Sequence, residues 1–150
     1  MRRQCVILAG GLGTRMRPST ETLPKALLPV NGTPFADLQL TWLRSEGFTD
    51  VVYSIGHLGQ QIRDFVGEGS RWDLRVTYSD EGNQALGTAG ALRLALHQNL
   101  LDPVFAVTYG DSLLDVSVDA MWRRYEESGL SALMTEIGRA SCRERVCLAV

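Results

Sequence analysis

The sequence predicts an α/β fold: a Rossmann-like, doubly wound and mostly parallel sheet with helices on both faces. Three observations predict it. Short apolar runs alternate with segments of helical periodicity over the first 135 residues. A glycine-rich loop directly follows the first apolar run, and Gly110-Asp111 follows the fourth. Such sheets bind ligands at the carboxyl ends of their strands, so we expect these two segments to meet at one edge.

The strands are predicted from their apolar runs, which have the length and continuity of buried parallel strands. The first run, QCVILA, ends in glycines, and the third, LRVTYS, alternates apolar with polar residues. The five predicted strands are 4–9, 50–55, 74–79, 103–109 and 130–135.

Four helices are predicted between the strands, because apolar residues recur there at helical spacing. Predicted N-caps are Thr33 (followed by Pro34), His57, Thr88 and Ser117, and Gly47 and Gly129 end the first and fourth helices. The predicted buried stripes are Phe35, Leu38 and Trp42; Leu58, Ile62, Phe65 and Val66; Ala89, Leu92 and Leu96; and Val118, Met121, Trp122 and Tyr125.

The composition is that of a globular domain without a basic surface. Hydrophobic residues make up 45% and charged residues 21% of the 150 residues, and the net charge is -2. No apolar run reaches the roughly 18 residues of a spanning helix, and the one after Arg3 is too short for a signal peptide. Cys5, Cys142 and Cys147 show neither metal-ligand spacing nor an even disulfide framework, and Cys5 is expected to be an inert buried thiol. We therefore expect a cytoplasmic protein without nucleic-acid or membrane partners.

The loop LAGGLGTRMR, residues 8–17, is the first candidate for chemistry. It matches neither the P-loop pattern nor the dinucleotide fingerprint, because Met16 stands where the latter needs its third glycine. Glycines directly after a strand still let backbone N–H groups approach an anion closely. Arg15 and Arg17 add positive charge nearby. The alternative is a plain glycine-rich turn with arginines on the surface.

Lys25 is the second candidate, because it is the only lysine in a chain with fourteen arginines. An ammonium is a compact charge on a flexible stem, which arginine does not supply. Pro24 and Pro29 restrict the backbone on either side of it. This setting indicates a positioned charge, and the alternative is a surface salt bridge.

Four sequence blocks together resemble the sugar-phosphate nucleotidyltransferases, also called nucleotide-sugar pyrophosphorylases. They are GGLGTRM at 10–16 with Pro18, the Pro24-Lys25 and Pro29-Val30 pairs, LGTAGAL at 86–92, and Tyr109-Gly110-Asp111. Their order and spacing agree with the family over residues 4–135. The resemblance implies a truncated nucleotidyltransferase fold, with 1–135 as its nucleotide-binding part.

The resemblance also implies a reaction. A nucleoside triphosphate and a sugar 1-phosphate give a nucleotide sugar and pyrophosphate, by positioning and charge stabilisation. Arg15 and Lys25 are the implied catalytic residues, and Asp111 is the implied Mg²⁺ ligand. The implied nucleotide-binding residues are Leu8, Ala9, Gly10, Gly11, Gly13, Thr14, Gly87 and Thr88. Asp111 alone could equally be a turn residue, and Thr88 a simple helix cap.

The sequence is compatible with more than one base, acceptor and role. The segment 80–85 is longer than the corresponding segment of the family, so Glu81 and Gln84 are both candidates for reading the base. The LGTAGAL block favours the guanylyltransferases of heptose or mannose 1-phosphate, and the glucose 1-phosphate thymidylyltransferases are the alternative. A non-catalytic nucleotide-sugar-binding regulatory subunit and a transferase for another phosphorylated partner, such as phosphocholine, are the alternatives. Retention of Arg15, Lys25 and Asp111 favours the enzyme. The full-length enzyme could be a homo-oligomer.

Residues 136–150 are predicted to be a non-native tail. IGRASCRERV, at 137–146, resembles the translation of a common sequencing adapter. Such segments are left out of fold predictions. The alternative is a genuine arginine-rich helix start.

We expect that the 150-residue chain alone does not catalyse the reaction of a nucleoside triphosphate with a sugar 1-phosphate. The resemblance implies that a second metal-binding carboxylate and the sugar pocket come later in the chain. Without the sugar pocket the attacking phosphate is not oriented, and such orientation can lower the activation barrier by about 7–11 kcal/mol. The measurement is pyrophosphate release from each nucleoside triphosphate with glucose, mannose or heptose 1-phosphate and Mg²⁺. Release at about 1 s⁻¹ or faster would show that these residues hold a complete active site.

Overall fold

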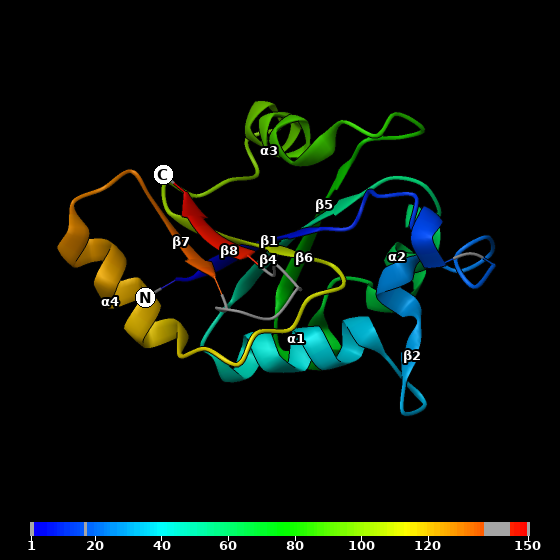
Figure 1. Ribbon diagram of the computed structural model, residues 1–150, viewed down its shortest axis with the longest axis horizontal. Helices are drawn as coiled ribbons and strands as arrows, with labels where there is room; N and C mark the ends of the chain where they lie inside the picture. Colours follow the sequence, from blue (N-terminus) through cyan, green and yellow to red (C-terminus); the bar gives the residue numbers. More distant parts are fainter. Residues whose placement is uncertain (1, 17, 137–144, 150) are drawn as a thin grey trace.

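A six-stranded sheet forms the centre of the computed structural model, which describes residues 2–16, 18–136 and 145–149 (Figure 1). The strands lie in the order β5 (Arg75–Asp80), β4 (Asp50–Ile55), β1 (Gln4–Leu8), β6 (Phe105–Tyr109), β8 (Arg145–Ala149) and β7 (Ala132–Glu136). The first four are parallel, and β8 is antiparallel to both β6 and β7. The predicted mostly parallel α/β sheet is confirmed.

The helices cover both faces of this sheet. They are α1 (Phe35–Ser45), α2 (Gly59–Val66), α3 (Gly87–His97) and α4 (Val118–Ser128). Figure 1 shows α1 and α3 on opposite sides of the strands. The connections also contain the 3-10 turns η1 (Thr14–Met16), η2 (Lys25–Leu27) and η3 (Ser70–Trp72), and a small hairpin of β2 (Pro29–Val30) and β3 (Thr33–Pro34).

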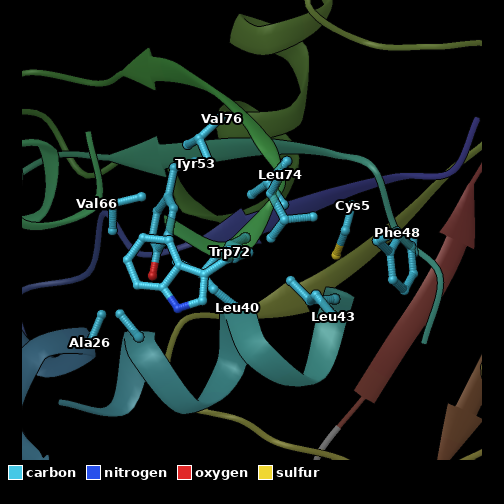
Figure 2. Packing of buried hydrophobic residues seen from close by; sticks show 14 of the residues in the cluster. Cys5, Ala26, Leu40, Leu43, Phe48, Tyr53, Val66, Trp72, Leu74 and Val76 are labelled. Atoms are coloured by element: carbon cyan, nitrogen blue, oxygen red, sulfur yellow. The ribbon is translucent and has the colours of Figure 1, made fainter. Parts of the chain in front are cut away.

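Two apolar clusters result, because successive strand residues point to opposite faces. The larger cluster joins Cys5 and Tyr53 of the sheet to Leu40 and Leu43 of α1 and to residues of α2 and α4 (Figure 2). The smaller one packs Ala95 of α3 against the other face. Cys5 is buried, as expected, and this burial raises the pKa of its thiol.

Two of the predicted helix faces are wrong. In α1 the buried residues are Ala36, Gln39, Leu40 and Leu43, while Leu38 is exposed and Phe35 and Trp42 are half-buried. In α3 the small residues Ala91 and Ala95 are buried, and Leu92 is half-buried while Ala89 and Leu96 are exposed. The apolar residues of both helices fit more than one stripe, and packing against the sheet selects among them. The face predicted for α4 is confirmed, and Ile62 and Val66 of α2 are buried while Leu58 and Phe65 are half-buried.

The predicted caps also differ from the structure in three of four cases. Ser117 does cap α4, since its hydroxyl accepts the N–H of Ala120 at 3.3 Å. Thr33 lies in β3, one residue before the cap position of α1. Thr88 does not cap α3, because it lies in the first turn of that helix, which starts at Gly87 after the cap residue Leu86. At the start of α2, Leu58 takes the cap position in the left-handed region, at φ 58°, so His57 does not cap it.

The tail contributes a strand that the sequence analysis does not predict. Arg145–Ala149 forms β8, which pairs with β6 over three positions and with β7 over five. The predicted last strand, 130–135, is observed as β7, which is hydrogen-bonded to β8 at the edge of the sheet. Ile137 and Cys142 lie outside the described residues. The adapter origin of 136–150 stays a prediction.

Within the described part of the chain, none of the helices combines the length and the apolar character that crossing a membrane requires.

Removal of residues 137–150 is expected to affect β7 locally and the domain little. The strand that pairs with β7 is β8, which this deletion removes. The amides of Ala132–Glu136 should therefore lose protection from hydrogen exchange. A non-native tail has no evolved partner surface, so the melting temperature should stay within about 2–4 °C, the effect of ~1 kcal/mol in a domain of this size. A large fall in melting temperature would contradict the non-native interpretation of the tail.

Candidate functional site

The sheet changes its winding direction between β1 and β6, and the candidate site lies there. From β1 the chain passes through α1 to β4 on one side, whereas α3 leads to β6 on the other. The segments that leave the carboxyl ends of β1 and β6 therefore diverge and leave a crevice between them. The glycine loop follows β1, and Gly110-Asp111 follows β6. The expected meeting of these two segments is confirmed.

A cavity of about 410 Å³ occupies this crevice. Its wall is built by the glycine loop, the start of η2, the segment before α3 and the turn after β6. The lining residues are Leu8, Ala9, Gly10, Gly11, Gly13, Thr14, Met16, Lys25, Ala26, Glu81, Ala85, Gly87, Thr88, Tyr109, Gly110 and Asp111.

The structure thus brings ten of the eleven predicted site residues to one cavity. These are the eight predicted nucleotide-binding residues together with Lys25 and Asp111. The eleventh, Arg15, belongs to η1 beside the cavity, and its side chain lies outside the described part of the structure, as does the whole of Arg17. Neither histidine lines the cavity.

The glycine loop is held to the sheet by backbone contacts. Ala9 donates its N–H to the carbonyl of Ser54 at 2.8 Å, which ties the start of the loop to β4. Gly13 has a φ of 60°, which favours glycine, and its carbonyl accepts the hydroxyl of Thr20 at 2.8 Å. The loop is fixed at both ends, while Gly11 between them is exposed.

Lys25 and Asp111 both line the cavity, and their side chains contact each other. The Nζ of Lys25 forms an ion pair with Oδ2 of Asp111, and the side chains are 39% and 36% exposed. Lys25 begins η2 directly after the buried Pro24, whose carbonyl accepts the N–H of Leu27 at 2.8 Å. The predicted positioned charge is therefore an amine on a restrained turn beside a carboxylate. Such a pair offers a cation to phosphate oxygens and a carboxylate to a metal ion.

Asp111 fits a metal site in which the phosphates of a substrate supply some of the ligands. No group of three or more His, Cys, Asp or Glu side chains within residues 2–16, 18–136 and 145–149 could hold a metal. Mg²⁺ commonly takes one or two carboxylates, several waters and substrate phosphates. A partly exposed carboxylate on a cavity wall meets that requirement.

Of the two candidates in the segment 80–85, Glu81 lines the cavity and Gln84 does not. The Glu81 carboxylate accepts the hydroxyl of Ser54 at 3.2 Å and the N–H of Leu86 at 2.8 Å. These two donors hold it against Gly10 of the glycine loop. Glu81 is thus a fixed acceptor within the cavity.

Tyr109 is a cavity residue that the sequence analysis does not predict. Its hydroxyl lies 3.4 Å from Oγ1 of Thr88, so the pair connects the end of β6 to the first turn of α3. Its position directly before Gly110-Asp111 was a usable signal, because the last residue of a strand beside a ligand loop often borders the site.

A nucleotide-binding α/β protein is the class that this crevice defines, with its glycine loop, amine and carboxylate at a switch point. Residues 4–143 match the family described as Nucleotidyl transferase, and the chain belongs to this family. The resemblance noted in the sequence is confirmed.

Two relatives show what the chain is similar to. It is 41% identical over 120 residues to N-acetylmuramate alpha-1-phosphate uridylyltransferase of Neisseria meningitidis, an alignment that covers 80% of this chain and 52% of the relative. It is 34% identical over 138 residues to UTP–glucose-1-phosphate uridylyltransferase of Synechocystis, with 86% of this chain and 36% of the relative covered. The chain thus spans between about a third and a half of these proteins.

The fold has solved counterparts. The structure superimposes on HddC from Yersinia pseudotuberculosis with a TM-score of 0.73 at 21% identity, over 98% of this chain and 76% of that one. At this identity the likeness shows the fold alone. The doubly wound α/β prediction agrees with it.

Gly110→Ala is expected to destabilise the protein by about 1–3 kcal/mol, the usual cost of overpacking. A Cβ at this position would lie 2.9 Å from Cβ of Ala9 and 3.3 Å from the carbonyl oxygen of Leu8. Leu8 is the last residue of β1, and Ala9 is held by the hydrogen bond of its N–H to Ser54, so the ends of β1 and β6 would have to separate. Urea unfolding measures the change.

Gly11→Ala is the matched control for stability. Nothing lies within 4 Å of a Cβ at Gly11, and its φ is not in the left-handed region. Equal losses of stability in the two variants would contradict the tight contact between β1 and β6.

Proposed function

We propose that this chain is the nucleotide-binding part of an enzyme that joins a nucleoside triphosphate to a sugar 1-phosphate. The products are a nucleotide sugar and pyrophosphate. The observation that carries the proposal is the single cavity that collects the glycine loop, Lys25 and Asp111 at the switch point of the sheet. The two relatives named for uridylyl transfer to a sugar 1-phosphate support this reaction class.

The chemistry needs positioning and charge more than a protein nucleophile. An oxygen of the sugar phosphate attacks the α-phosphorus, a new P–O bond forms, and the bond from the α-phosphorus to the bridging oxygen breaks as pyrophosphate leaves. Negative charge builds on the leaving group in this step. Catalysis therefore requires cations and N–H donors that are already in place.

Each group of the cavity has a role in this step. Backbone N–H groups at Gly10, Gly11, Gly13 and Thr14 bind the triphosphate, and those at Gly87 and Thr88 approach the nucleotide from the first turn of α3. Lys25 supplies a point charge near the α-phosphate and the attacking phosphate. Arg15 neutralises the pyrophosphate with its planar fork, and Leu8 and Ala9 border the nucleotide.

Asp111 is the proposed ligand of the divalent metal that nucleotidyltransferases of this family generally use. Magnesium is the proposed ion, because a hard cation prefers carboxylate and phosphate oxygens. When bound, the ion would neutralise phosphate charge and align the attacking and leaving oxygens. Asp111 would hold the ion through its carboxylate, and the Lys25 ammonium beside it would then be available to phosphate oxygens.

Glu81 is the proposed base-reading residue. A carboxylate repels phosphates, so in this cavity its free acceptor capacity suits a nucleobase. Guanine, uracil and thymine all present ring N–H donors that a carboxylate can accept. The proposal covers bases with such a donor and includes the uridylyl, guanylyl and thymidylyl types.

A different phosphorylated acceptor is the second candidate. One further relative, 38% identical over 78 residues, is the choline-phosphate cytidylyltransferase of Streptococcus pneumoniae. Phosphocholine in place of each sugar 1-phosphate therefore belongs in the assay. The cytoplasmic location and the homo-oligomer stay predictions.

Nucleotide binding by the 150-residue chain tests the proposal directly. UTP, GTP, dTTP and CTP are titrated separately with saturating Mg²⁺ by calorimetry. Lys25→Ala is expected to weaken binding about tenfold or more, since hydrogen bonds to charged groups contribute about 1.5–3 kcal/mol. Lys25→Arg should restore little, because a planar fork does not replace a point charge. Equal affinity of the alanine variant and the unmodified protein would exclude Lys25 from the nucleotide site.

Asp111→Asn is expected to abolish most of the metal dependence while it leaves folding nearly unchanged. Asparagine keeps the shape of the side chain and loses its charge, and the position is partly exposed. The readouts are the Mg²⁺ concentration for half-maximal UTP binding and the melting temperature. An unchanged Mg²⁺ requirement would return Asp111 to a role in the turn.

A further inference from the structure

One buried amide of α1 holds the turn that carries Asp111. The Nε2 of Gln39 donates to the carbonyl oxygen of Tyr109 at 2.8 Å and to that of Ser112 at 2.7 Å. These two residues stand immediately on either side of Gly110-Asp111. The two N–H bonds of a single group therefore fix both ends of the turn.

Packing alone does not account for a glutamine at this position. Gln39 is fully buried on the face of α1 that also presents Ala36, Leu40 and Leu43 to the core. A buried amide costs free energy unless its hydrogen bonds are made, and its Oε1 has no partner among the described residues. An apolar residue would fill the site without that cost, but it would leave two carbonyls of the turn without these donors.

The same turn has a second anchor on the sheet. The N–H of Gly110 donates to the carbonyl of Leu8 at 2.9 Å, and the N–H of Ser112 donates to Tyr109 at 3.2 Å. The β1 strand thus holds the inner side of the turn, and Gln39 joins its two ends to α1. Between these anchors the side chain of Asp111 reaches Lys25.

We propose that Gln39 is a positioning residue, which sets the direction of the Asp111 carboxylate and thereby the affinity of the metal. This inference rests on the proposed function, because it assumes that Asp111 binds the ion. Gln39 itself touches neither metal nor nucleotide. It acts through the backbone of residues 109–112.

Two variants separate positioning from general stability. Gln39→Met keeps length and loses both donors, so the exchange rate of the Ser112 amide should rise at least tenfold. The affinity of the chain for Mn²⁺ with UTP, measured by electron paramagnetic resonance, should fall about tenfold. Leu43→Ala, one turn further on the same buried face, should lower the melting temperature and leave Mn²⁺ affinity unchanged. The same fall in Leu43→Ala would overturn the inference.

Gln39→Glu adds a readout that a purely structural role would not move. An ionised carboxylate cannot donate to carbonyls, whereas a protonated one donates a single bond. Burial raises the pKa of such a carboxyl, so Mn²⁺ affinity should improve relative to the unmodified chain as pH falls from 8 to 6. A constant ratio of the two affinities over this range would count against the inference.

Measurements in the Asp111→Asn variant distinguish a failure of this inference from a failure of the proposed function. With Asp111 neutral, Gln39→Met should cause no further loss of Mn²⁺ affinity, since the two residues act in sequence. If Asp111→Asn alone changes nothing, or the unmodified chain binds no Mn²⁺ with any nucleotide, the proposed function fails. If Asp111→Asn weakens binding and Gln39→Met does not, only the positioning role fails.

Discussion

The approach of β1 to β6 is the contact on which the site depends. The two strands are parallel neighbours, and the Gly110 N–H extends their hydrogen bonding one step beyond the strand ends, to the carbonyl of Leu8. This step requires a residue without a side chain, because Ala9 and Leu8 occupy the space. The glycine loop and the Asp111 turn are thereby placed on opposite sides of one crevice. Lys25 then reaches Asp111 from a third segment.

Charge within the crevice is distributed unevenly. The Lys25 ammonium and the Asp111 carboxylate neutralise each other in the free protein. Glu81 is held separately by Ser54 and Leu86 on the side of Gly10. The proposed ligand, a nucleoside triphosphate with its cation, fits this distribution with its phosphates toward Lys25 and its base toward Glu81. The two ends of the cavity therefore differ in charge in the ligand-free protein.

The strands and most of the candidate site could be predicted from the sequence, the strands for one physical reason and the site for another. Buried parallel strands leave continuous apolar runs such as QCVILA, and ligand loops leave glycines at fixed places. The faces of α1 and α3 were not predicted correctly, because their apolar residues fit more than one stripe. Gln39 could not be found in this way, since its partners are carbonyls of residues 70 and 73 positions away and carbonyls carry no sequence signal. The strand β8 could not be predicted either, because its segment has no strand-like periodicity.

A chain with fourteen arginines and one lysine carries its only side-chain primary amine on the wall of the cavity. Reagents that acylate amines and spare guanidinium groups can therefore modify two places, the N-terminus and Lys25. The extent of acylation at Lys25 is then a direct gauge of whether the crevice is open or filled.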